Sequence, residues 1–169
     1  MTVNGGLRSR LILDSLYHLI DDSLNALGWY DSGRQHLPVS VTAEPINNNE
    51  EVPLNTIGVE LDSSSDTDLE VGSNATIDDW LCYVDVYAEN PAIGLELSND
   101  IRDILRRQHP SINRDRAVLD VYDYRLATPT VLFTAFITNV RVDRARDWIQ
   151  LWKQNWVSLS FTLSDEGGD

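Results

Sequence analysis

The segment WLCYVDVYAENPAIGLELSNDIRDILRRQHP, residues 80–110, decides the fold of this chain. Its first ten residues alternate with a period of two, which predicts a strand with one apolar face and one wetter, partly aromatic face. The apolar face carries Trp80, Cys82, Val84, Val86 and Ala88. The opposite face carries Leu81, Tyr83, Asp85, Tyr87 and Glu89.

A helix is predicted directly after this strand. Asn90 can cap it, and Pro91 suits its first position because the missing N–H is not needed there. An apolar stripe follows at helical spacing, and His109-Pro110 ends it. The stripe consists of Ile93, Leu97, Ile101, Ile104, Leu105 and Gln108. We expect this helix to fold back over the apolar face of the strand.

The remaining periodic segments complete the prediction. An amphipathic helix is expected over residues 7–27, with Gly28 as its stop, and a polar turn over residues 29–36. Strands are expected over residues 37–41, where Pro38 marks an edge or the very start of the strand, and over 54–61, 117–124, 130–142 and 148–163. The order α-β-β-loop-β-α-β-β-β predicts an α+β fold. It consists of a single mixed, mostly antiparallel sheet with two helices packed on one face.

Length predicts one domain over residues 1–169. Within it, the Ser/Asp-rich stretch 62–76 is expected to be a long polar loop, and residues 164–169 a disordered acidic tail. The letters DSSSDTD alternate oxygen ligands as a calcium loop does, but the EF-hand spacing and its central glycine are absent.

Composition excludes several classes of protein. No apolar run approaches the roughly 20 residues of a membrane helix, and the first residues lack the pattern of a signal peptide. The only cysteine, Cys82, lies on the apolar strand face, where a buried structural thiol is expected. We therefore expect a protein of the reducing cytoplasm.

No catalytic, metal or cofactor motif is visible. His18, His36 and His109 fall in three separate elements without ligand spacing, and no phosphate-binding glycine loop, GxSxG or CxxC is present. Asp78-Asp79 precede a strand and point to opposite sides, which favours a turn over an acid/base pair. The expectation is a protein that is not an enzyme.

The charge is uneven. The formal net charge is −14, and residues 44–79 hold ten acids without Lys or Arg. Residues 102–146 hold nine arginines against five acids. This split serves solubility, or it lets copies associate, acidic part to basic part. Sequence-specific nucleic-acid binding is not expected at this charge.

Aromatic residues and arginines concentrate near the end of the chain. A hypothetical subunit or partner interface consists of Arg141, Arg144, Arg146, Trp148, Trp152 and Trp156. Trp and Arg dominate interface hot spots, although at least one of these tryptophans is expected in the core. Candidates for the second, uncovered sheet face are Tyr83, Tyr87, Tyr122, Tyr124, Trp152 and Trp156.

The layout resembles the tail terminator (tail completion) proteins of long-tailed bacteriophages, related to the lambda-like terminator. The resemblance is one of pattern and element order over residues 7–163. It lies in the N-terminal helix, WLCYVDVYAENPAIGLELSNDIRDIL, TVLFTAFITNVRV and RDWIQLWKQNWVSLSFTL. The long polar stretch departs from the shortest members of that family.

The resemblance implies a structural virion protein of the tail and neck, found in the host cytoplasm during assembly. Six copies would form a ring that caps the tail tube, ends tube polymerisation and docks to the head-tail connector, without membrane contact. DNA would pass through without sequence-specific binding. From the uneven charge, we expect the acidic residues Asp62, Asp66, Asp68 and Glu70 to line the lumen of such a ring or to contact a neighbour. The alternatives are a neck or head-completion protein, or an acidic DNA-mimic inhibitor.

Overall fold

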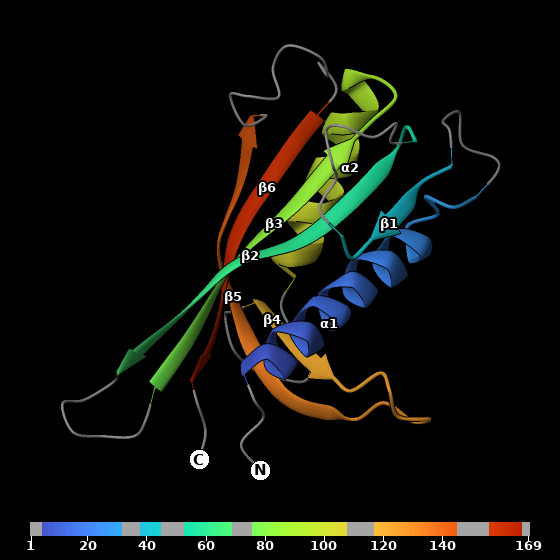
Figure 1. Cartoon of the computed structure of the whole chain (residues 1–169). Helices are drawn as coiled ribbons and strands as arrows, with labels where there is room; N and C mark the ends of the chain where they lie inside the picture. The colour runs from blue at the N-terminus through green and yellow to red at the C-terminus, as the bar shows by residue number, and fades with distance from the viewer. Residues whose placement is uncertain are drawn as a thin grey trace.

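The computed structural model describes residues 5–31, 38–44, 53–68, 76–107, 117–144 and 156–166. Two helices, α1 (Gly5–Ala26) and α2 (Pro91–Leu105), accompany a six-stranded sheet (Figure 1). The strands are β1 (Ser40–Thr42), β2 (Thr56–Asp68), β3 (Thr76–Tyr87), β4 (Ala117–Tyr122), β5 (Val131–Arg144) and β6 (Trp156–Glu166). The predicted α+β fold and its element order are confirmed.

The sheet has the order β1-β2-β3-β6-β5-β4 and curls around the helices (Figure 1). Only the β1–β2 pair is parallel, so the sheet is mixed and mostly antiparallel, as predicted. β3 lies inside the sheet between β2 and β6. β1 lies at an edge of the sheet, which is one of the positions that Pro38 predicted for it.

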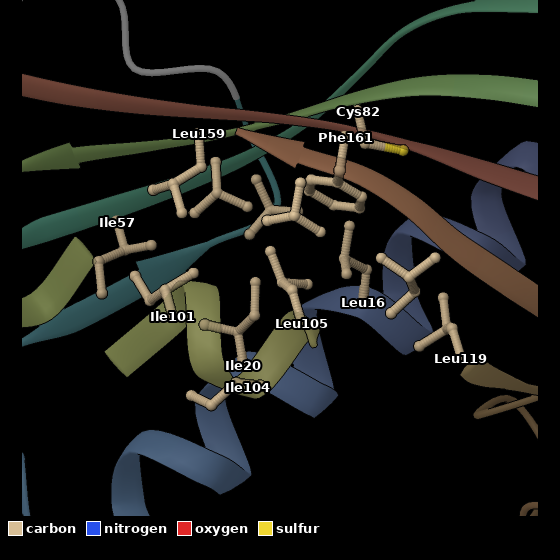
Figure 2. Packing of buried hydrophobic residues seen from close by; sticks show 14 of the residues in the cluster. Leu16, Ile20, Ile57, Cys82, Ile101, Ile104, Leu105, Leu119, Leu159 and Phe161 are labelled. Carbon is tan, nitrogen blue, oxygen red and sulfur yellow. The ribbon is translucent and has the colours of Figure 1, made fainter. Parts of the chain in front are cut away.

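One face of the sheet is covered by both helices. Cys82 and Val84 of β3 are buried together with Leu159 and Phe161 of β6, because odd–even alternation puts them on the same side. Figure 2 shows the helix residues that meet them. They include Leu16 and Ile20 of α1, and Ile101, Ile104 and Leu105 of α2. The strand–helix return predicted from residues 80–110 is thus confirmed.

The start of α2 is the one that the sequence predicted. The Asn90 side chain accepts hydrogen bonds from the backbone N–H groups of Ala92 and Ile93, both at 3.0 Å. Pro91 stands at the first helical position, where its missing N–H leaves nothing unsatisfied. A separate hydrogen bond fixes where the chain leaves β3. The N–H of Glu89 donates to the side chain of Asn55 at 2.9 Å.

The end of α1 differs from the prediction in one respect. Gly28 has φ 77° and ends the helix, as expected. The N–H of Trp29 returns to the carbonyl of Leu24 at 3.0 Å, which turns the Trp29 side chain inward. Trp29 is fully buried, and its indole N–H donates to Asp100 of α2 at 2.8 Å. The sequence placed Trp29 in a polar turn, but the helix-ending geometry makes it part of the core.

The prediction of a loop over residues 62–76 is wrong for residues 62–68 and 76, and residues 69–75 lie outside the described residues. Residues 62–68 belong to β2 and pair with β3 as far as Asp68 opposite Thr76, after a bulge between Leu61 and Ser63. Antiparallel pairing satisfies backbone groups whatever the side chains, so a polar segment can extend a hairpin into solvent. We call residues 62–68 and 76–79 the acidic arm, and Figure 1 shows it projecting from the body of the sheet.

The end of β6 also differs from the prediction. Residues 164–166, expected in a disordered tail, form the end of β6 and pair with Asp79, Asp78 and Ile77. β6 is described from Trp156 onward. The predicted start of this strand at Trp148 lies outside the described residues, as do all of residues 145–155 and 167–169.

The Asn90 cap is testable. Asn90→Ala should lower the free energy of unfolding by about 1 kcal/mol, because two N–H groups at the start of α2 lose their acceptor. Urea denaturation followed by circular dichroism measures this. Asn90→Ser, which keeps a capping oxygen, is the matched control and should lose much less. Equal losses in both variants would show that the side chain acts through another contact.

Candidate functional site

The described residues contain no group of three or more His, Cys, Asp or Glu side chains that could hold a metal. Cys82 is fully buried, and burial raises the pKa of its thiol to about 12. Such a thiol stays protonated and unreactive at neutral pH, in agreement with the structural role expected for it. No described helix is long and apolar enough to cross a membrane.

Only part of the predicted Arg/Trp interface lies among the described residues. Arg141 is exposed on β5, in register with Ser160 of β6. Arg144 pairs with Val157 at the end of β5, and Trp156 pairs with Tyr87 at the start of β6. Arg146, Trp148 and Trp152 lie outside the described residues, so the interface stays a prediction.

The predicted acidic residues lie along the acidic arm. Asp62 is exposed at the bulge of β2. Asp66 stands opposite Asp78, and Asp68 opposite Thr76, whereas Glu70 lies outside the described residues. The described acidic residues of this stretch therefore lie in paired strands and not in a loop.

An ion pair fixes α1 to the base of this arm. Arg8 contacts Asp165 of β6, and both side chains are largely shielded from solvent. The guanidinium also lies over the rings of Trp80 and Phe133, at 5.7 Å and 4.8 Å from the ring centroids. Four elements (α1, β3, β5 and β6) therefore meet at one cation. No local pattern reveals this pairing, because 157 positions separate Arg8 from Asp165.

The outer face of the sheet is polar and aromatic. Glu60, Tyr83 and Ser160 form one row across β2, β3 and β6, and Gly58, Asp85 and Ser158 form the next. Ser158 donates to the Asp85 carboxylate at 2.6 Å, and both residues are buried. Tyr83 and Tyr87 lie on this face, as expected.

Tyr124 does not lie on the outer face. It follows β4 and stacks on His18 of α1, with 3.9 Å between ring centroids. The prediction for Tyr124 extended the strand alternation past residue 122, where β4 ends and the chain turns toward α1. For Tyr122, the backbone N–H donates to the buried Ser15 of α1 at 2.9 Å.

A pocket of about 530 Å³ lies where the two edges of the curled sheet approach α1. We call it the seam pocket. Its walls are formed by α1, by β1 with the residue after it, and by the chain following β4. The lining residues are Arg10, Asp14, Tyr17, His18, Val41, Thr42, Ala43, Tyr124 and Arg125. It is a shallow, open groove and not an enclosed cavity.

The charged groups of the seam pocket already have partners. Arg125 donates through Nε and Nη2 to the two oxygens of Asp123, at 2.7 Å and 2.6 Å. Arg10 lies 3.9 Å from Asp14, one helical turn away. Burial, with the nearby carboxylates of α1, raises the pKa of Tyr17 and of Tyr124, so both phenols keep their protons. The pocket is aromatic, rich in hydrogen-bond donors and electrically balanced.

Sequence reasoning missed this pocket. His18 lies beside the apolar stripe of α1, and its side chain is half-buried. What brings His18 and Tyr124 together is the curl of the sheet, which no local pattern reveals.

Neither a protein-family model nor a curated protein sequence matches this chain significantly.

The ion pair of Arg8 with Asp165 can be tested by a double-mutant cycle. Arg8→Leu should cost about 3 kcal/mol of stability, because it leaves a shielded carboxylate without its partner. The double variant Arg8→Leu with Asp165→Leu should recover part of that loss in urea denaturation. A double variant that loses the sum of the two single losses would show that the side chains do not interact.

The Asp123–Arg125 pair predicts a pH dependence. Hydrogen bonds from Arg125 lower the pKa of Asp123 below its ordinary value. The stabilisation is therefore complete above the unfolded pKa of about 3.9 and is lost as the pH falls through the folded pKa. Arg125→Gln should raise the pKa of Asp123 toward that ordinary value in a carboxyl NMR titration. Arg10→Gln, in the same pocket, should leave it unchanged; equal shifts would contradict the assignment.

Proposed function

We propose that this chain is a structural virion protein of a long-tailed bacteriophage. In this role it forms a ring, most simply a homo-hexamer, on the end of the tail tube. The ring stops tube polymerisation and offers a docking surface to the head-tail connector. This is the role that the sequence resemblance implied, and the fold is compatible with it.

The observation that carries the proposal is the division of the sheet into two faces. One face is covered by both helices, and no described element covers the other. That outer face holds Tyr83 and Tyr87, half-buried, around the buried Asp85–Ser158 pair. Tyrosine-rich surfaces with small polar residues are typical of protein–protein contacts, because Tyr supplies contact area together with a hydrogen-bonding end.

The charge supports a role around passing DNA. Six copies would carry a large negative charge, and carboxylates facing the lumen repel phosphate within about 8–10 Å at physiological salt. The acidic arm, with Asp62 exposed and Asp66 and Asp68 in its strands, is our candidate for the lumen wall. DNA would then cross the ring without binding to it.

The proposal predicts rings and capped tubes. Negative-stain images of the purified protein, alone or with tail tubes assembled from the tube protein of the same genome, should show rings, and tubes that stop growing once the protein is added. A discrete dimer in light scattering, or tubes that lengthen unchanged, would contradict the proposal. Rings that bind the connector but do not stop the tube would indicate the neighbouring neck position.

A further inference from the structure

The turn between β4 and β5 carries apolar side chains into solvent. We call residues 126–132 the hairpin tip. Leu126, Val131 and Leu132 are exposed by 48%, 47% and 46% of their surface, and the residues between them are exposed as well. Figure 1 shows this connection extending from the lower right of the molecule. Exposed apolar residues grouped in this way mark a contact site more often than scattered ones do.

The hairpin tip is also uncharged. Residues 126–140 contain no Asp, Glu, Lys or Arg in a chain whose net charge is −14. Two copies of such a chain repel each other over most of their surface. A contact between copies is therefore most favourable where neither surface adds charge, and the hairpin tip meets this condition.

The seam pocket is likewise a surface without net charge. Arg10 lies beside Asp14 and Arg125 is held by Asp123, so the pocket has no net charge to offer a charged ligand. Val41, Thr42 and Ala43 form its wall along the edge strand β1. β1 is paired only with β2 within the described residues, which leaves its other edge available to an extended segment.

The hairpin tip does not occupy the pocket of its own chain. Tyr124 and Arg125 line the pocket, and from Leu126 onward the chain is exposed. We propose that the hairpin tip of one copy docks in the seam pocket of a second copy. β1 and β4 are opposite edges of the sheet, so the two surfaces that meet are different.

A contact between different surfaces is heterologous, and contacts of this kind generate rings when the rotation closes. The inference thus deepens the proposed function and rests on it for the closed ring. The contact itself needs only two copies. It names the hairpin tip and the β1 edge as the surfaces through which neighbours in the ring touch.

Cross-linking between two single variants tests this contact. Cys82 is the only native cysteine and is buried, so it does not compete. Protein carrying Leu126→Cys is mixed with protein carrying Thr42→Cys and oxidised. The mixture should give a reducible dimer on a denaturing gel, and neither variant should do so by itself. Leu95→Cys, on the exposed side of α2, replaces Leu126→Cys in the matched control and should give only background.

Each other outcome overturns the inference. A dimer formed by Leu126→Cys alone, as strong as in the mixture, would mean that two tips meet symmetrically. A mixture that gives no more dimer than the Leu95→Cys control would mean that the tip does not reach the pocket, whether or not rings form. Rings without the cross-link would contradict this inference and leave the proposed function intact. The cross-link without tube capping would support this inference and contradict the proposed function.

A second variant measures the energy of the contact. Leu126→Ser with Leu132→Ser should weaken self-association by about tenfold or more, because the contact loses apolar area that the hairpin tip would bury. Both positions are exposed, so the thermal midpoint of the variant should stay close to that of the parent chain. Unchanged association with an unchanged melt would overturn the inference as well.

Discussion

The structure depends on the burial of one face of the sheet by both helices. Strands with a period of two and helices with a period of 3.6 share a core only where their apolar faces coincide. Here Cys82, Val84, Leu159 and Phe161 face the stripes of α1 and α2 (Figure 2). Within the described residues, both helices cover one face of the sheet and no element covers the other. The seam pocket lies where the two edges of the curled sheet meet α1.

Much of this arrangement could be predicted from local pattern. The strand, the cap and the helix of residues 80–105 can be predicted from local sequence alone, because Asn90, Pro91 and the apolar spacing act over a few positions. The acidic arm could not be predicted in this way. Its polar composition is typical of a loop, and only the pairing with β3 shows that it is a strand. Trp29 was missed for a related reason, because a left-handed Gly28 reverses the direction of the chain after α1.

The candidate surfaces were predicted less well than the fold. The arginines and tryptophans of residues 141–156 were chosen for their type, and residue type does not say which side chains the fold exposes. The seam pocket joins Arg10 and His18 to Thr42 and Tyr124, residues from three distant segments. The buried Asp85–Ser158 pair is likewise a product of register between β3 and β6. Surfaces formed by several elements become visible only once the sheet order is known.

The position of β6 has a consequence for how the chain folds. β6 lies between β3 and β5, although it is the last strand in sequence. Until residues 156–166 are available, the sheet exists as two pieces, β1-β2-β3 and β5-β4, each with an open edge. Pairing β3 with β6 closes contacts across 69 to 89 positions, which is slow relative to local hairpins. During synthesis, β3 therefore keeps one edge unpaired until β6 is available, and in this interval the growing chain is open to mispairing with its neighbours.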